Sequence, residues 1–139
     1  MKFNTRIRYG IRAILEIALN ETDTGVFQKD IADHQQISVK YLDTIISSLK
    51  TAGLIINKRG RKSGYVLTRK PEEIKMLDVY SAFEPGVVIV DCIDRNYICK
   101  LSKQCGVREF WSGLNDVIEN YLESYTLEDL IKEHRSKRV

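Results

Sequence analysis

The chain contains 139 residues, of which 43% are hydrophobic and 29% are charged. This length predicts one domain, or one small domain with an appended dimerisation element, and the composition excludes a disordered chain. No apolar run approaches the ~18 residues of a membrane span, and the basic start lacks the apolar stretch of a signal peptide. We therefore expect a cytoplasmic protein with no membrane partner, in which thiols stay reduced.

The net charge of +3 is distributed unevenly along the chain. Residues 1–70 contain 13 lysines and arginines against 6 aspartates and glutamates, whereas residues 71–139 contain 9 against 13. Such asymmetry can be a random scatter of solvated charge. It can also indicate a basic N-terminal module that faces a polyanion, followed by an acidic half with another task.

Hydrophobic periodicity predicts three helices in the first part of the chain. An apolar stripe at helical spacing runs from Ile7 to Ala18, and a turn follows at 20–25. A short helix around QKDIADHQ leads through a tight link to a third helix, with Ser38 as its N-cap and Gly53 just beyond its end. The predicted buried face of the third helix consists of Leu42, Ile45, Ile46 and Leu49.

A basic β-hairpin is predicted next. The β-prone runs Leu54–Ile56 and Tyr65–Leu67 flank the segment NKRGRKSG, whose two glycines suit a hairpin loop. Four of five consecutive residues near the tip are cationic: Lys58, Arg59, Arg61 and Lys62. These elements follow the order of a winged helix-turn-helix: helix, short helix, tight link, capped helix and basic hairpin. We therefore expect a mainly α fold with a small β-hairpin wing.

The second half of the chain is predicted to contain another helical face, a loop and a long helix. The face runs from Met76 to Phe83, and the loop-like stretch that follows holds every cysteine of the chain. Apolar residues then recur at helical spacing from Phe110 to Tyr125. This stripe exceeds what the core of a small domain needs, so we expect a dimerisation helix; packing within one chain is the alternative. A capping box at Thr126 predicts a short final helix.

The order of elements predicts a DNA reader. The third helix can lie in the major groove, where it offers short polar groups and lysines, while the hairpin can reach phosphates or the adjacent minor groove. A plain surface helix and a solvated turn are the alternatives. The candidate DNA-binding residues are Ser38, Lys40, Tyr41, Thr44 and Ser47 in the helix and Arg59, Arg61 and Lys62 in the hairpin.

Several stretches of the chain resemble the winged-helix repressor family that includes the iron–sulfur regulator IscR and the nitric-oxide sensor NsrR. They are RYGIRAILEIAL, KDIADHQQISVKYLDTIISSLKTAGLI, RGRKSGYVLTRKPEEIKMLDVYSAFE and YTLEDL, and together the resemblance covers nearly the whole chain. It implies a homodimer, joined through the helix that contains 110–125, on a palindromic operator in double-stranded DNA. The hairpin departs from the family pattern, because Arg61, Lys62 and Ser63 stand where members usually have more glycines.

We expect three segments. Residues 1–84 form the winged helix-turn-helix DNA-binding domain, 85–106 the cysteine-containing sensor loop, and 107–139 the dimerisation helix with the C-terminal tail. The loop holds Cys92, Cys99 and Cys105, at the place where cluster-binding members of the family carry theirs. Thiolates are natural ligands of iron–sulfur clusters, so a cluster is expected. A metal-free thiol switch and inert structural cysteines are the alternatives.

At the positions where the resemblance implies a fourth ligand for such a cluster, this chain has different residues. Members with a 2Fe–2S cluster place a histidine where this chain has Arg108, and the nitric-oxide sensor has an aspartate at the position of Arg8. His34 from the partner chain is the remaining histidine candidate, although a surface histidine with no ligand role is commoner. The acidic residues nearby in sequence are Asp91, Asp94 and Glu109. An iron left open to water or a small thiol would favour 4Fe–4S over 2Fe–2S.

No catalytic arrangement is recognisable. The chain has only His34 and His134, and neither a phosphate-cradling glycine loop nor a Ser/His/Asp set can be proposed, so we do not expect an enzyme. We expect a DNA-binding transcriptional regulator, acting as a repressor, that senses iron–sulfur, redox or nitric-oxide status through its cluster. The alternatives are a thiol-based redox regulator of the same fold and an iron–sulfur interaction protein that no longer binds DNA.

Overall fold

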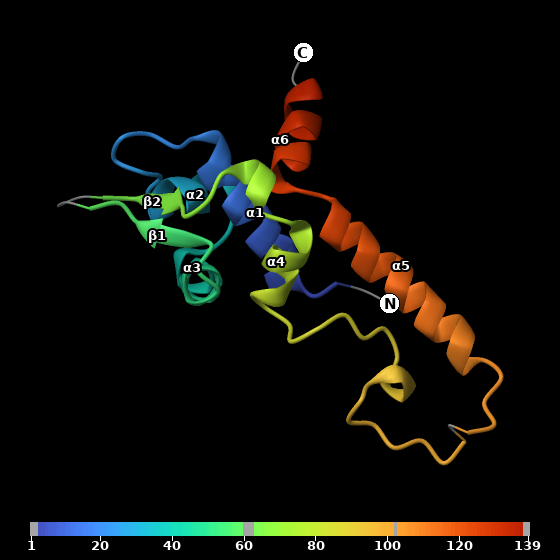
Figure 1. The fold of residues 1–139 in the computed structure, drawn as a ribbon. Coiled ribbons are helices and arrows are strands. Elements are labelled where there is room, and N and C mark those ends of the chain that lie inside the picture. The colour runs from blue at the N-terminus through green and yellow to red at the C-terminus, as the bar shows by residue number, and fades with distance from the viewer. Residues whose placement is uncertain (1–2, 60–62, 102, 138–139) are drawn as a thin grey trace.

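The computed structural model describes residues 3–59, 63–101 and 103–137, so the predicted hairpin residues Arg61 and Lys62 lie outside the described residues (Figure 1). The described residues contain six α-helices, two 3₁₀ helices and a two-stranded sheet. Their bounds are α1 Thr5–Leu19, α2 Gln28–Gln35, α3 Val39–Thr51, β1 Ile55–Asn57, β2 Tyr65–Leu67, η1 Pro71–Glu73, α4 Met76–Ser81, η2 Asp91–Ile93, α5 Arg108–Ser124 and α6 Leu127–Ser136.

Side-chain caps fix where three of the helices begin. The Asn4 side chain accepts a hydrogen bond from the backbone N–H of Ile7 at the start of α1. Ser38 does the same for α3, and Thr126 with Asp129 forms the predicted capping box of α6. Each cap satisfies backbone N–H groups that the first helical turn leaves without a partner. The predicted N-caps at Ser38 and Thr126 are therefore confirmed.

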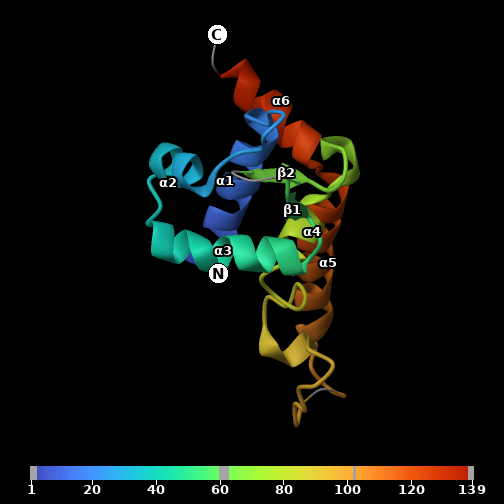
Figure 2. The ribbon, with the colours of Figure 1, turned by 90° about the vertical axis from the view of Figure 1, so that its left-hand side faces the viewer.

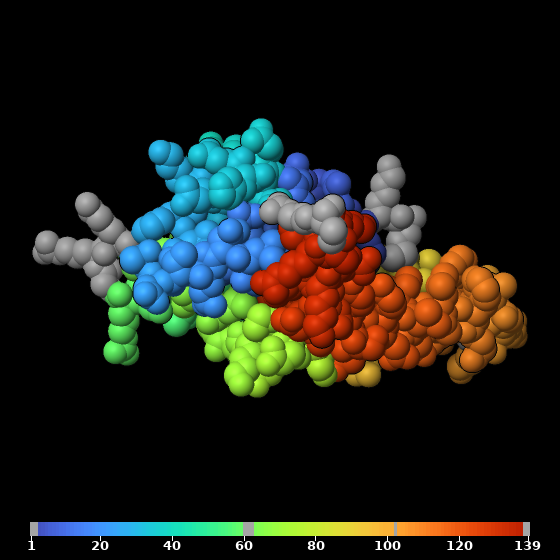
Figure 3. All heavy atoms as spheres, turned by 90° about the horizontal axis from the view of Figure 1, so that it is seen from above, coloured from blue at the N-terminus to red at the C-terminus, as the bar shows by residue number. Residues whose placement is uncertain are grey.

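The hydrophobic core lies between α1, α2 and α3, which lie close together in Figure 2. All four residues of the predicted α3 face are buried, and each such side chain stabilises the fold by roughly 1.5–3 kcal/mol. Leu127 and Ile131 of α6 belong to the same core. Figure 3 shows α6 (red) lying against the blue residues of the N-terminal helices. The last helix thus packs into the winged-helix module. The boundaries of the three expected segments, 1–84, 85–106 and 107–139, stay a prediction.

The hairpin forms the wing of the fold. Strands β1 and β2 are antiparallel, with Ile56 opposite Val66, and β1 begins one residue later than the predicted run. The segment before α2 packs closely on the wing, because Val26 bridges to Tyr65. A Cβ atom on Gly25, whose φ is +81°, would lie 2.6 Å from the backbone of Gly64. These two positions therefore require glycine if the loop and the wing are to touch.

Helix α5 projects away from the winged-helix module, and the cysteine loop runs from α4 to its far end (Figure 1). Along the predicted stripe, Phe110, Leu114, Val117 and Tyr121 are exposed, and the only fully buried residue that α5 contributes is Asn115. The stripe is therefore largely uncovered by its own chain. None of the helices in the described ranges has the length and apolar character to cross a membrane.

Candidate nucleic-acid interface and cysteine loop

Helix α3 presents a short polar face opposite its buried one. Lys40, Thr44 and Ser47 are exposed, as predicted for residues that approach base edges and phosphates. Ser38 is exposed as well, but its hydroxyl oxygen accepts the backbone N–H of Tyr41 at 3.1 Å as the N-cap. The structure thus brings these four predicted residues to one end and one outer face of a rigid, capped helix.

Tyr41 is half-buried and lies differently from the other predicted residues. Its ring packs edge-on against the ring of Tyr9 in α1, with 5.6 Å between centroids and an interplanar angle of 87°. The guanidinium of Arg12 lies 5.1 Å from the centre of the Tyr9 ring. Edge-on aromatic pairs of this kind contribute about 0.5–1.5 kcal/mol beyond area burial. Tyr41 therefore ties α3 to α1, and only part of its side chain is exposed.

Two residues of α3 were not among the predicted contacts. Val39 is 55% exposed at the first position of the helix, and its carbonyl oxygen accepts a hydrogen bond from Gln28 of α2. The Lys50 ammonium donates to the Asn57 side chain at 2.9 Å and lies near the Tyr65 ring, so it connects α3 to the wing. Val39 was not named from the sequence although it directly follows the N-cap, and N-terminal residues of recognition helices commonly contact base edges.

The wing lies beside α3, on the side of the module away from α5 (Figure 1). Lys58 and Arg59 are exposed where the hairpin leaves β1. The backbone N–H of Lys58 donates to the Gly64 carbonyl at 2.8 Å, and this hydrogen bond joins the two arms of the hairpin just beyond β1 and β2. Of the four predicted cations, the structure describes these two, which lie where β1 leads into the tip of the wing.

The three cysteines lie along the loop between α4 and α5. Cys92 is in η2, Cys105 is three residues before α5, and all three are half-buried with free thiols. Cys105 also lines a depression of about 480 Å³ with Arg108 and Glu109. The donor chemistry suits an iron–sulfur cluster. However, within 3–59, 63–101 and 103–137, no three cysteine, histidine or carboxylate side chains lie close enough together to hold a metal ion.

The two arginines at the family's fourth-ligand positions are not plausible ligands, and they and the candidate His34 lie in different surroundings. Arg108 is beside Cys105, whereas Arg8 is exposed on α1 and donates to the hydroxyl of Thr5. His34 lies on α2, which Figures 1 and 2 place away from the cysteine loop. Its Nδ1 is 2.5 Å from the carboxylate of Glu16, and because a carboxylate only accepts, the imidazole donates. This hydrogen bond, together with the negative charge of Glu16, raises the pKa of His34.

An apolar groove lies between α1 and α5. It has a volume of about 680 Å³ and is lined by Phe3, Ile7, Arg8, Ile11 and Leu122. Leu122 belongs to α5, and the exposed apolar stripe of this helix runs from Phe110 to Tyr121. Apolar surface of this extent on a small protein is typical of an association surface.

A winged helix-turn-helix with an exposed polar recognition helix and a cationic wing defines a DNA-binding transcriptional regulator. The Rrf2 family, described as "Iron-dependent Transcriptional regulator", matches residues 3–133. The chain therefore belongs to the Rrf2 family. This confirms both the predicted family resemblance and the predicted winged-helix fold.

Relatives of known name cover almost the whole chain. The protein rrf2 of Nitratidesulfovibrio vulgaris is 38% identical over 133 residues, which are 96% of this chain and 89% of that protein. The regulator IscR of Aliivibrio salmonicida is 32% identical over 139 residues, which are 100% of this chain and 82% of that protein.

Solved structures show the same architecture. CymR, the global cysteine regulator of B. subtilis, superposes with a TM-score of 0.78 at 31% identity, covering 96% of this chain and 98% of that chain. IscR of T. potens has a TM-score of 0.78 at 29% identity, covering 100% and 92%. These neighbours support the assignment of the fold across both the winged-helix module and α5.

Proposed function

We propose that this Rrf2-family regulator is a repressor that binds a palindromic operator as a homodimer and senses its signal through the cysteine loop. The observation that carries the DNA-binding part is the exposed polar face of α3 beside a wing with exposed cations where β1 leads into its tip. Ser38, Lys40, Thr44 and Ser47 would face the major groove, with the accessible edge of Tyr41. Arg59 would contact phosphate, together with the predicted wing residues Arg61 and Lys62.

The proposed dimer rests on α5. Its exposed residues Phe110, Val117 and Tyr121, together with the apolar groove beside Leu122, leave a continuous apolar surface without cover in one chain. A second copy related by a two-fold axis can cover this surface, since a two-fold interface pairs the same patch on both subunits. Two recognition helices held in this way would meet two symmetric half-sites, which accounts for a palindromic operator.

The proposed cofactor is an iron–sulfur cluster on Cys92, Cys99 and Cys105. When bound, such a cluster supplies an iron centre whose state changes with oxidation and with nitric oxide. The three thiols fit this group in donor type and in their place on one loop, and the lack of an evident fourth ligand favours 4Fe–4S over 2Fe–2S. Drawing the three thiols together would tighten the loop between α4 and α5. The angle of the dimerisation helix to the DNA-binding module would then change.

A metal-free thiol regulator is the second candidate. The described residues do not assemble the three cysteines into a metal-binding group, and all three thiols are free. The structure is also similar to an oxidized form of Staphylococcus aureus CymR, with a TM-score of 0.73 at 27% identity, covering 94% of this chain and 96% of that chain. In this case a reversible disulfide within the loop would change the same angle.

Anaerobic purification separates the two candidates. A brown protein with iron and matching sulfide supports the cluster, with about four irons per chain for 4Fe–4S and about two for 2Fe–2S. A colourless protein whose thiol count falls reversibly on mild oxidation supports the thiol regulator. DNA binding is tested by selection from a random duplex library and with the region upstream of the gene itself. No binding to either at low salt would reject the regulator and favour an iron–sulfur protein that has lost DNA binding.

A further inference from the structure

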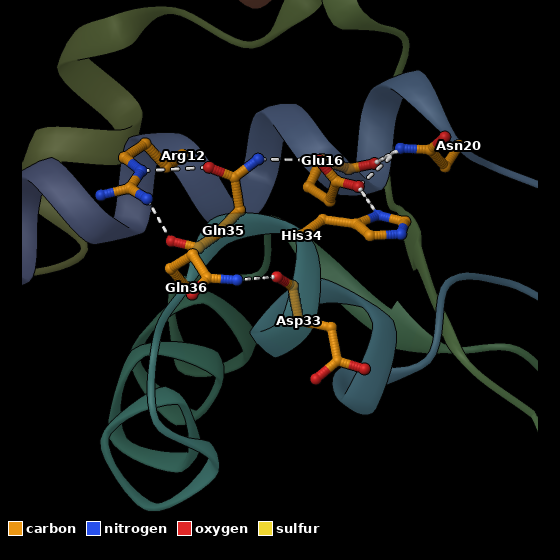
Figure 4. Close-up of polar contacts among 7 residues, drawn as sticks. All are labelled: Arg12, Glu16, Asn20, Asp33, His34, Gln35 and Gln36. Atoms are coloured by element: carbon orange, nitrogen blue, oxygen red, sulfur yellow. Dashed lines mark hydrogen bonds and ion pairs between the residues drawn. The ribbon is translucent and has the colours of Figure 1, made fainter.

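A buried carboxylate in α1 lies at the centre of a polar network outside the proposed DNA contacts. Glu16 is only 6% exposed, and Figure 4 shows three side chains directed at its carboxylate. Asn20 Nδ2 donates at 2.9 Å, His34 Nδ1 at 2.5 Å and Gln35 Nε2 at 2.8 Å. A buried carboxylate is tolerated only when such partners replace water. The arrangement therefore depends on these donors.

The side-chain amide of Gln35 has a single satisfied orientation in this network. Its Nε2 donates to Glu16, while its Oε1 accepts from Arg12 Nε at 3.0 Å. A second nitrogen of the Arg12 guanidinium donates to the backbone carbonyl of Gln35. Both contacts come from α1, so one helix holds Gln35 by its side chain and by its backbone (Figure 4).

Gln35 is the last residue of α2, at the turn that leads into the recognition helix. Gln36 follows in the left-handed conformation with φ 56°, and Ser38 is already the N-cap of α3. The backbone N–H of Ile37 donates to the Ala32 carbonyl at 3.1 Å, which makes this turn tight. Because so few residues separate Gln35 from α3, a displacement of Gln35 is transmitted to the start of the recognition helix.

We propose that Glu16 and Gln35 are positioning residues for operator recognition. Together they fix the end of α2 against α1, and thereby the angle at which α3 enters the major groove. This inference rests on the proposed function, since it assumes that α3 reads DNA. Because Glu16 is buried, it acts on DNA binding only through the side chains of α2 that it holds, Gln35 and His34. Recognition of a specific sequence requires the angle of α3, whereas non-specific binding to phosphates does not.

The donor and acceptor pattern allows a compensation test with two single variants and their double. In Glu16→Gln the amide of residue 16 cannot satisfy His34, Asn20 and the Gln35 amide at once. In Gln35→Glu two carboxylates face each other. In the double variant the pattern is restored with the roles exchanged, because the amide at 16 donates to the carboxylate at 35, which also accepts from Arg12. The double variant has the same net charge as the parent.

Each single variant should weaken operator binding about tenfold, the effect of losing one hydrogen bond to a charged group. The double should return to within about threefold of the parent. Affinity for non-specific duplex should change little. The salt dependence of operator binding should stay the same, because the number of phosphate contacts does not change. Dissociation constants are measured at 10 °C, with the folded fraction of each variant taken from circular dichroism.

Other outcomes would overturn the inference. If net charge alone governed affinity, Glu16→Gln would tighten binding and Gln35→Glu would weaken it. Glu21→Gln removes one negative charge at an exposed position and serves as the control for this charge effect. Parental operator affinity in both folded single variants, or no recovery in the double, would reject the positioning role. If Gln35→Glu does not fold, Gln35→Ala, which removes one of three donors, must still lower the ratio of operator to non-specific affinity. If the parent protein binds no DNA, the proposed function itself is contradicted. If the parent binds its operator and the variants bind equally well, only this inference is contradicted.

Discussion

Val39 is the exposed apolar side chain at the beginning of the recognition helix, next to the polar residues proposed to face DNA. An apolar side chain in the major groove can contact the 5-methyl group of thymine, which no other base offers. We therefore predict one thymine per half-site whose replacement by deoxyuridine weakens binding about fourfold, the effect of one buried methyl group. In Val39→Ala the same replacement should have no effect. Equal losses in parent and variant at every thymine would contradict this role.

Arg59 belongs to the sequence-independent part of the interface. If its guanidinium contacts one phosphate, Arg59→Ala should weaken binding to all duplexes, and the slope of log affinity against log salt should fall by about 0.9. Arg95→Ala removes the same charge from the exposed cysteine loop and serves as the control, for which we expect the parental slope. Binding isotherms at four salt concentrations measure both. Identical slopes for Arg59→Ala and the parent would exclude the phosphate contact.

His34 should make the stability of the fold depend on pH. The hydrogen bond to Glu16 raises its pKa above the value of about 6.5 in the unfolded chain, and the charge of Glu16 acts in the same direction. The folded state therefore holds this proton more tightly, so the stabilisation is complete below that value and is lost as pH rises through the raised pKa. Urea unfolding should show the largest difference between the parent and His34→Gln at pH 5.5, decreasing towards pH 8.5. A difference that grows with pH would contradict this pairing.

Glu16 also shows why part of the site could not be predicted from sequence. It lies between Leu15 and Ile17, and its partners His34 and Gln35 come from another helix. Helical periodicity describes which face of one helix is buried, but not which polar side chains meet across two helices. The exposure of Lys40 and Thr44 was predictable, since it follows from the opposite, apolar face of α3.

At the scale of elements, local signals determined most of the fold. The stripe of α1, the caps Ser38 and Thr126 and the glycine-containing hairpin all act within a few residues, so the order of helices and strands follows from them. The cysteine loop has no periodic pattern, and its conformation depends on contacts that a sequence does not reveal. The same holds for α6, whose packing into the winged-helix core was not predicted.

Helix α5 is the proposed dimerisation element. Val117 is 64% exposed, so Val117→Glu should leave the fold of one chain intact while placing a charge in the proposed interface. Sedimentation equilibrium should show a shift from dimer to monomer mass at micromolar concentration. Asn120→Glu introduces the same charge at an exposed polar position of α5 and should remain dimeric. A dimer that withstands Val117→Glu would move the interface elsewhere.

Across the whole molecule, the charge is distributed unevenly over the elements. The basic residues 1–70 contain α1 to α3 and the wing, and the acidic residues 71–139 contain α4, the cysteine loop, α5 and α6, of which α6 packs back into the winged-helix core. The loop connects the module to the far end of α5, so a change in the loop can alter the distance between two recognition helices in a dimer. The family and fold are established, whereas the dimer, the operator and the sensing of a signal through the loop are proposed.

The central claim is that two copies of α3 read two symmetric half-sites. Footprinting of anaerobically purified protein on its selected operator tests this most directly. We expect two protected half-sites related by two-fold symmetry, with centres about 34–36 Å apart or at a multiple of that spacing, on one face of the duplex. Protection of a single half-site, or no protection at low salt, would contradict the claim.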